Sequence, residues 1–156
     1  VMATLSVTIK ETVTLNGKER GSENVLDITS VNQVYHRIVT CPANVDTTVA
    51  TFRSGTNVAD GALDVEDVKY IRVTNLDSSN DLNLSLQIDA GEDDSAADES
   101  ATILLQAGKS FIMGTPSDGI AVDDSAATIV TALHNLESIL LDPGTNAISA
   151  EIFIAS

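Results

Sequence analysis

Aromatic residues and cysteine are scarce in this 156-residue chain. Aromatic side chains make up 3 % of the sequence, tryptophan is absent, and there is one cysteine. A single cysteine excludes a disulfide within the chain and a zinc site built from several thiolates. Glycoside hydrolases use a pair of carboxylates that can come from distant strands, so the sequence alone does not exclude such a pair. The scarcity of aromatic rings for stacking against sugars nevertheless disfavours this activity.

Basic residues are scarce as well. Eight lysines and arginines stand against 23 aspartates and glutamates, and the net charge is −15. A nucleic-acid-binding surface needs cations to displace phosphate counterions, so we expect no nucleic-acid partner. No apolar stretch approaches the roughly 20 residues of a membrane-spanning helix, so we expect no membrane partner. Hydrophobic residues still reach 43 %, which predicts one folded domain over residues 1–156 rather than a disordered acidic chain.

The acidic charge is concentrated after residue 78. Residues 1–78 carry ten acidic and seven basic residues, whereas residues 79–156 carry thirteen acidic residues and one base, Lys109. The first part can form surface ion pairs of mixed sign, and the second cannot. We therefore expect the second part to face bulk water or to meet cations or a basic partner.

Two segments alternate between apolar and polar residues, which is the pattern of a strand with one buried face. In residues 4–15, leucine, valine and isoleucine alternate mainly with threonine and serine, and Asn16-Gly17 then supplies a turn. In residues 82–89, the four leucine and isoleucine side chains are expected to face inward and the polar residues between them outward.

Shorter β-branched segments bounded by turn residues fill most of the remaining chain. Residues 128–141 are ambiguous, because their leucines fit helical spacing while residues 136–141 fit a strand; we expect a loop or short helical turn that enters a strand. No long amphipathic helix is visible, which disfavours parallel βαβ folds. About nine or ten short strands predict an all-β, antiparallel, jelly-roll-like β-sandwich. The other expected strands cover residues 25–28, 31–41, 47–53, 68–76, 101–107, 110–114 and 147–155.

No catalytic constellation is visible. The chain has no Gly-x-Ser-x-Gly motif, and its two histidines, His36 and His134, lie among apolar residues. Cys41 follows His36 by five residues in the same expected strand, so the two side chains project from opposite faces and cannot form a nucleophile–base pair. We therefore expect no enzymatic activity, no catalytic residue and no cofactor.

An acidic loop is the best local candidate for a ligand site. Residues 89–99 contain six carboxylates, and calcium takes six to eight oxygen ligands from flexible loops. The EF-hand spacing is absent, and crowded carboxylates are also typical of a solvated surface, so both interpretations stay open. Residues 115–127 could complete a site only if the two loops meet in space. The calcium candidates are Asp89, Glu92, Asp93, Asp94, Asp98, Glu99, Asp123 and Asp124, with Asp118 close to the last two.

Three stretches carry a resemblance to a known group of proteins. They are MATLSVTI (2–9) with LNGK (15–18), IRVTNL (71–76) with LLQAGKSF (104–111), and LESI (136–139) with AEIFIAS (150–156). Together they resemble small β-sandwich virion proteins of tailed phages, particularly marine ones, and the resemblance covers most of the chain. It carries no catalytic residues that could be transferred.

This resemblance implies a non-enzymatic virion protein, assembled in the host cytoplasm and most specifically a capsid decoration or cement protein on the outside of the head shell. Its partners would be the major capsid protein, other virion proteins and copies of itself, and trimers would suit the lattice points of a shell. The less acidic N-terminal part would dock on the shell while the acidic part faces water. The open alternatives are a head- or tail-appendage subunit (a fibre or adaptor) and a calcium-assisted glycan-binding β-sandwich module.

Overall fold

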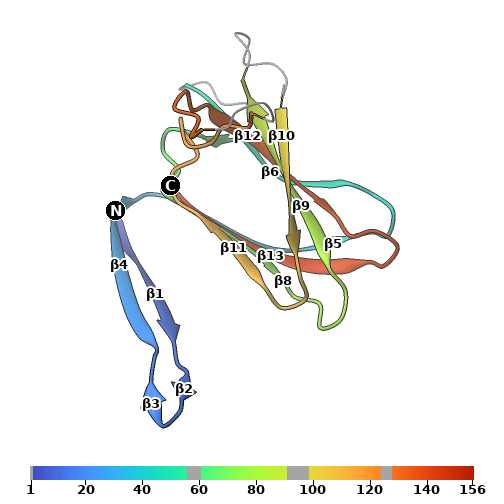
Figure 1. Cartoon of the computed structure of the whole chain (residues 1–156). Coiled ribbons are helices and arrows are strands. Elements are labelled where there is room, and N and C mark those ends of the chain that lie inside the picture. The colour runs from blue at the N-terminus through green and yellow to red at the C-terminus, as the bar shows by residue number, and fades with distance from the viewer. Residues whose placement is uncertain (1, 56–60, 91–98, 124–127) are drawn as a thin grey trace. The chain divides into compact units, whose positions relative to one another are not determined.

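The computed structural model describes residues 2–55, 61–90, 99–123 and 128–156. These residues form thirteen strands and no helix, which confirms the predicted all-β fold class. The described part of the chain accordingly holds no helix that could cross a membrane. The chain divides into two compact units, residues 1–33 and residues 34–156, both drawn in Figure 1.

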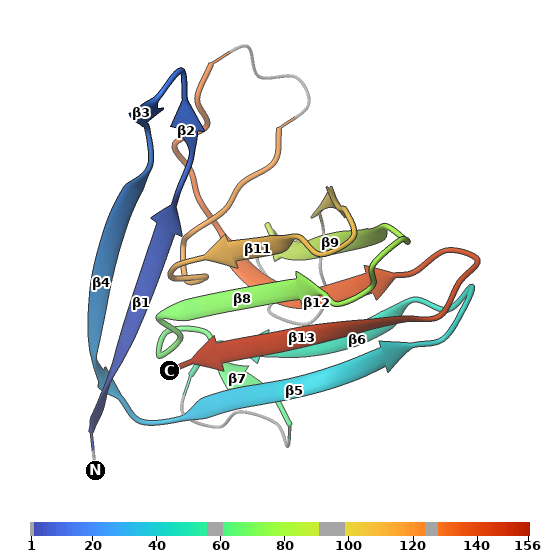
Figure 2. The same cartoon turned by 90° about the horizontal axis from the view of Figure 1, so that it is seen from below.

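The second unit is a β-sandwich whose strands pair antiparallel, apart from the short parallel pair β6-β7 (Figures 1 and 2). One sheet has the strand order β10-β9-β12-β6-β7, and the other has the order β11-β8-β13-β5. The main pairs are nested along the chain, because β5 pairs with β13, β6 with β12, β8 with β11 and β9 with β10. Nested pairs shared between two sheets in this order make an eight-stranded jelly roll, as predicted. The bounds are β5 (Val34–Cys41), β6 (Thr47–Arg53), β7 (Leu63–Asp64), β8 (Tyr70–Asn75), β9 (Leu82–Asp89), β10 (Glu99–Leu105), β11 (Ser110–Met113), β12 (Asn135–Asp142) and β13 (Ile148–Ala155).

The hydrophobic core lies between the two sheets and follows from the two-residue period of the strands. The leucine and isoleucine side chains of β9 are buried, and the residues between them face outward, as the alternation predicted. Strand β13 repeats the pattern in the opposite sheet. Burying each such side chain contributes about 1.5–3 kcal/mol, so the sandwich has a core that needs no disulfide. The buried side chains of these two strands are Leu82, Leu84, Leu86, Ile88, Ile148, Ala150, Ile152 and Ile154.

The ambiguous segment forms a loop that enters strand β12, and the alternative of a helical turn is wrong. The pairing of β12 with β9 shifts between Leu136 and Ser138, which is the mark of a β-bulge. The bulge buries two consecutive residues, Leu136 and Glu137. Ile129 is 91 % exposed and lies in the loop before β12. The helix-like spacing of the leucines and isoleucines therefore has two origins: part of it lies in an exposed loop, and part in a strand whose alternation shifts by one residue at the bulge.

The strand count exceeds the predicted nine or ten because three strands have only two residues each: β2 (Thr14–Leu15), β3 (Lys18–Glu19) and β7. Strand β4 (Ser22–Val31) is also longer than the expected 25–28. Very short pairings carry almost no pattern in the sequence, so alternation alone does not reveal them.

The first unit is a β-hairpin, called the N-terminal hairpin below. Strand β1 (Ala3–Glu11) pairs with β4, and β2 (Thr14–Leu15) pairs with β3 (Lys18–Glu19). Asn16 and Gly17 form the predicted turn with φ angles of 52° and 75°, the left-handed conformation that a tight hairpin turn requires. Gly21 has a different role, because a Cβ there would lie 1.9 Å from the Glu11 carbonyl oxygen.

The N-terminal hairpin has one apolar face, formed where Leu5 lies opposite Ile28 and Val7 lies opposite Leu26 and extended by Ile9. These five residues are called the hairpin face. The alternation therefore predicted the strand and its apolar side correctly. The expectation that this side is buried is wrong for most of it: Leu5 and Val7 are half-buried, whereas Ile9, Val13 and Leu15 are exposed.

Asn75, at the end of β8, joins the two sheets of the sandwich. Its side chain is fully buried, and its Nδ2 donates hydrogen bonds to the carbonyl oxygens of Asn80 at 2.9 Å and Leu105 at 3.0 Å. Its Oδ1 accepts a hydrogen bond from the Asp77 amide at 2.9 Å. Since Leu105 ends β10 in the opposite sheet, this amide group bridges the layers and satisfies three backbone groups.

We predict that Asn75→Ala lowers the free energy of unfolding by about 2–4 kcal/mol, because it leaves buried backbone groups without partners. Urea unfolding at neutral pH measures the change. The matched control, Asn83→Ala, removes an exposed asparagine from β9 and should change stability by less than about 0.5 kcal/mol. Equal effects of the two substitutions would show that the bridge between the sheets contributes nothing.

Candidate functional site

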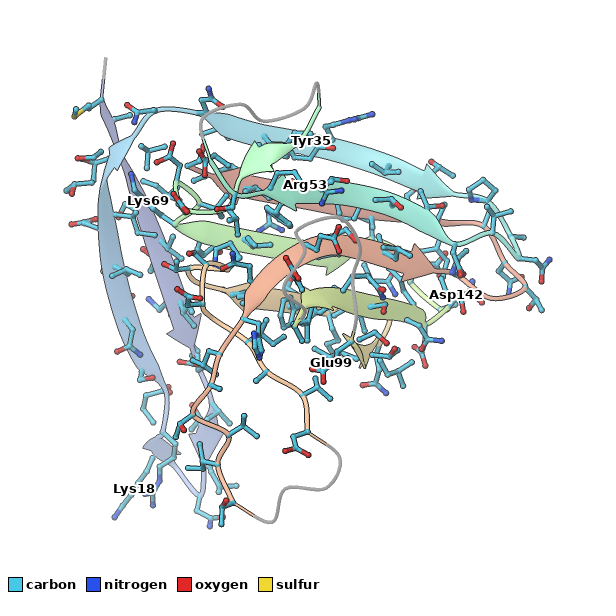
Figure 3. All side chains as sticks on the ribbon, turned by 90° about the horizontal axis from the view of Figure 1, so that it is seen from above. Lys18, Tyr35, Arg53, Lys69, Glu99 and Asp142 are labelled. Carbon is cyan, nitrogen blue, oxygen red and sulfur yellow. The ribbon has the colours of Figure 1, made fainter. Side chains whose placement is uncertain are left out.

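The predicted calcium ligands fall only partly within the described residues. Glu92, Asp93, Asp94, Asp98 and Asp124 lie outside them. Asp89 ends β9 and Glu99 begins β10, and Glu99 is labelled in Figure 3. Because β9 and β10 are paired, these two residues come from neighbouring strand ends.

Glu99 and Asp123 line one surface hollow, together with His134. The two acidic loops that the sequence singled out thus each supply a described carboxylate to the same hollow. Within the described residues, however, no three or more histidine, cysteine, aspartate or glutamate side chains form a group that could hold a metal ion. The calcium site stays a prediction.

Asp89 lines a different place, a small cavity beside the bulge of β12. Glu137 and Arg53 also line it, and Arg53 on β6 is labelled in Figure 3. The Arg53 Nη1 donates to Glu137 Oε1 at 2.8 Å and to the Phe52 carbonyl oxygen at 2.8 Å. Glu137 Oε2 is buried and accepts no hydrogen bond from the described residues. A guanidinium in contact with Glu137 opposes a second cation, so this cavity is a poor calcium site and the ion pair is better explained as a structural element.

We predict that Arg53→Met lowers the free energy of unfolding by about 2–3 kcal/mol, because it leaves the Glu137 carboxylate buried without its cation. Thermal or urea unfolding measures the loss. Lys109→Met removes one positive charge from an exposed position and serves as the control for the change in net charge. The double variant Arg53→Met/Glu137→Met should recover most of the lost stability; failure to recover would contradict the explanation.

The outward surface of the β11-β8-β13-β5 sheet carries a network of polar side chains. Glu151 on β13 lies at its centre, with Oε1 at 2.7 Å from His36 Nε2 on β5 and Oε2 accepting from Arg72 Nη1 on β8 at 2.8 Å. Arg72 also donates to Thr74 Oγ1, which lies 2.7 Å from Ser110 Oγ on β11. The network therefore crosses all four strands, which lie side by side in Figure 2.

This network neutralises charge rather than preparing a nucleophile. The hydrogen bonds from Arg72 and His36 hold the pKa of the Glu151 carboxyl below its ordinary value of 4.5. Cys41, the chain's one thiol, is fully buried on the inner side of β5, and burial raises its pKa, which disfavours the reactive thiolate. His36 and Cys41 thus project from opposite faces of β5, as predicted from their spacing.

We predict that Glu151→Gln removes part of the acid sensitivity of the protein. Because folding lowers the pKa of Glu151, its contribution to stability is complete above pH 4.5 and disappears as the pH falls through the lower, folded-state value. The difference in unfolding free energy between the parent and Glu151→Gln should shrink as the pH falls below 4.5. Asp67→Asn, at an exposed position, gives the baseline for losing one acidic charge. A difference that is constant between pH 7 and pH 3 would contradict the prediction.

Sequence reasoning missed the Glu151 network, the Arg53–Glu137 pair and the exposure of the hairpin face. The available signal for the network was one charged residue in each of two expected strands, Arg72 and Glu151, flanked on both sides by apolar residues. That these strands are neighbours depends on the register of β13 with β8, which the sequence does not display. The pair at Glu137 depends on the bulge, and a bulge interrupts the very alternation from which burial is predicted.

Comparisons with known proteins assign no family to the chain. No family model matches it, and no curated protein matches it. One solved structure is similar, described as "Bacillus endospore appendages form a novel family of disulfide-linked pili". Its chain is 10 % identical, the alignment covers 78 % of this chain and 84 % of that one, and the TM-score is 0.36. A TM-score this low assigns no function, so the resemblance to virion proteins stays a prediction.

Proposed function

We propose that this protein is a non-enzymatic structural subunit of an assembled particle, and most specifically a decoration or cement protein on the outside of a tailed-phage head shell. The observation that carries the proposal is the N-terminal hairpin. A two-stranded hairpin is at best marginally stable by itself in water, and this one exposes Leu26 at 57 % on its apolar face. A segment of this kind gains its stability from contact with another molecule, which is the property of an assembly subunit.

The charge distribution supports the same role. Residues 1–33 carry four acidic and three basic residues, whereas residues 34–156 carry nineteen acidic and five basic residues. The hairpin is therefore the part of the chain that can approach another protein with little electrostatic repulsion, and the acidic sandwich would face water. The proposed partners are the major capsid protein or other virion proteins, and copies of the chain itself. A head- or tail-appendage subunit would use the same features and differ only in its place on the particle.

The convergence of Glu99 and Asp123 on one hollow favours a second candidate, a calcium-assisted glycan-binding module. Acidic oxygens from two loops are suited to calcium. Against this candidate, the described residues that line the hollow include no phenylalanine, tyrosine or tryptophan ring. The effect of calcium on the melting temperature therefore distinguishes the two functions.

Particles purified from the natural source on a density gradient test the first function. Quantitative mass spectrometry should find this chain at tens to hundreds of copies per particle, as expected for a repeated surface lattice, and antibodies should label the outside of intact heads. Labelling confined to a tail or fibre would favour the appendage subunit. Recovery of the chain only from the soluble cell fraction would contradict a particle role.

Thermal unfolding with and without a calcium chelator tests the second function. The structural role predicts a melting temperature that changes by less than about 2 °C, because the described core contains no metal site. A fall of about 10 °C that is reversed by added calcium would favour the calcium-assisted module. Magnesium at the same ionic strength is the control for simple charge screening.

A further inference from the structure

The N-terminal hairpin is an amphipathic sheet of two main strands, and part of its apolar side is exposed. Its apolar side is the hairpin face, defined above as Leu5, Val7, Ile9, Leu26 and Ile28. Polar residues dominate the other side, where Ser6 lies opposite Asp27 and Lys10 lies opposite Glu23. Such a face requires a second apolar layer, because two strands alone rarely supply a stable core.

The sandwich exposes an apolar surface of its own, at the β5 edge of the four-stranded sheet. Val34 is 54 % exposed and Ile38 is 66 % exposed. Val34 and Ile38 both face the outward side of the sheet, where they lie opposite Ala155 and Glu151 of β13. Phe153 of β13 lies between Ala155 and Glu151 on the same side, opposite His36. Val34, Ile38 and Phe153 are called the sheet patch. Exposed apolar residues gathered in this way mark interaction surfaces.

The sheet patch is also a place where the acidic charge of the sandwich is locally cancelled. Glu151, next to Ile38, is paired with both Arg72 and His36. An apolar partner that docks here covers a carboxylate already neutralised by its neighbours. The rest of the sandwich is much more acidic, so a contact between two sandwiches elsewhere would bring like charges together.

The hairpin in turn brings positive charge at its tip. Its carboxylates Glu11 and Glu23 are engaged within the hairpin, with Ser22 and Lys10. Amides of Gly21 and Val13 bind the Glu19 carboxylate and hold its pKa below the ordinary value. Lys18 and Arg20 make no ion pair with the described residues, and Lys18 extends away from the tip in Figure 3. The basic tip therefore holds one net positive charge, since Lys18 and Arg20 flank the ionised Glu19. Together with the apolar face, this tip is complementary to an acidic sandwich with an apolar patch.

We propose that the N-terminal hairpin docks on the sandwich of a second copy of this chain, with the hairpin face packed on the sheet patch. One contact then covers both exposed apolar surfaces and sets the basic tip against an acidic molecule. The contact is heterologous, since different surfaces of the two copies meet, and repeated use closes a ring or extends a filament. The proposal uses the same hairpin as the particle-surface role, but the two fail separately, because a protein can bind a particle and still be a monomer in isolation.

The test measures the oligomeric state of the full chain by light scattering after size exclusion. The parent protein is expected at a multiple of its 16.3 kDa mass. Leu26→Asp on the hairpin face and Ile38→Asp on the sheet patch should each weaken association about tenfold or more. The controls are Val25→Asp and Leu104→Asp, because Val25 is 59 % exposed on the opposite side of the hairpin and Leu104 is 57 % exposed in the other sheet. Both controls should associate like the parent.

Mixing the two interface variants gives the decisive result. The Leu26→Asp copy keeps an intact sheet patch, and the Ile38→Asp copy keeps an intact hairpin face, so the mixture should form a 1:1 dimer while each variant alone stays monomeric. A monomeric parent at its highest soluble concentration would overturn the proposal and indicate that the chain's own sandwich or another protein covers the hairpin. Association lost equally in Val25→Asp or Leu104→Asp, or no dimer in the mixture, would also overturn it.

Discussion

The two sheets of the sandwich and the β1-β4 sheet each have one apolar face, and such a face needs a second layer to exclude water. The sandwich meets this requirement within residues 34–156, where the inward side chains of β9 and β12 pack against those of β8 and β13. The N-terminal hairpin has the same alternation, but its main sheet has only two strands, and Ile9 and Leu26 on its apolar face are exposed. This difference in the burial of apolar side chains separates the stable scaffold from the segment proposed for assembly.

The jelly-roll order follows from the same requirement. Nested pairing places the first strand of the sandwich beside the last, so β5 lies next to β13 and at the edge of its sheet. This position leaves one edge of β5 without a neighbouring strand in its sheet. Val34 and Ile38, which face outward from this edge strand, are exposed. An edge strand with apolar side chains is a place where other chains can bind. The acidity of the chain repels other acidic molecules from most of its surface. The sheet patch is an exception, because the Glu151 carboxylate beside it is paired with Arg72 and His36.

The sequence was sufficient to predict the fold class, because long strands such as 82–89 alternate without interruption and turn residues separate them. It was also sufficient to place the Asn16-Gly17 turn and to put His36 and Cys41 on opposite faces of one strand. It was not sufficient for Glu137, whose burial depends on a bulge, or for the Arg72–Glu151 pair, whose contact depends on the register of two strands far apart in the chain. Alternation reports which side of a strand is apolar, but it does not report what covers that side, and so the exposure of Ile9, Val13 and Leu15 was mispredicted.

The acidic residues, which appeared from the sequence to form one ligand site, have several different roles. Glu19 closes the hairpin tip, Glu137 pairs with Arg53 beside the core, and Glu151 balances charge on the outer sheet. Of the loop carboxylates in the described residues, Glu99 and Asp123 share a hollow and Asp89 lines a separate cavity. The two outer surfaces of the sandwich therefore differ. On the β11-β8-β13-β5 sheet the Glu151 charge is locally compensated, which suits this sheet to contact with another protein, whereas the rest of the sandwich surface is strongly acidic.

The central claim is that another copy covers the hairpin face, and hydrogen exchange of the hairpin amides tests it most directly. Exchange of residues 3–11 and 22–31 is measured at low and high protein concentration, with the amides of β9 and β13 as internal standards. Coverage by a second copy predicts that hairpin protection rises about tenfold or more with concentration while the sandwich amides stay unchanged. Hairpin amides protected to the same extent at both concentrations, or unprotected at both, would contradict the claim.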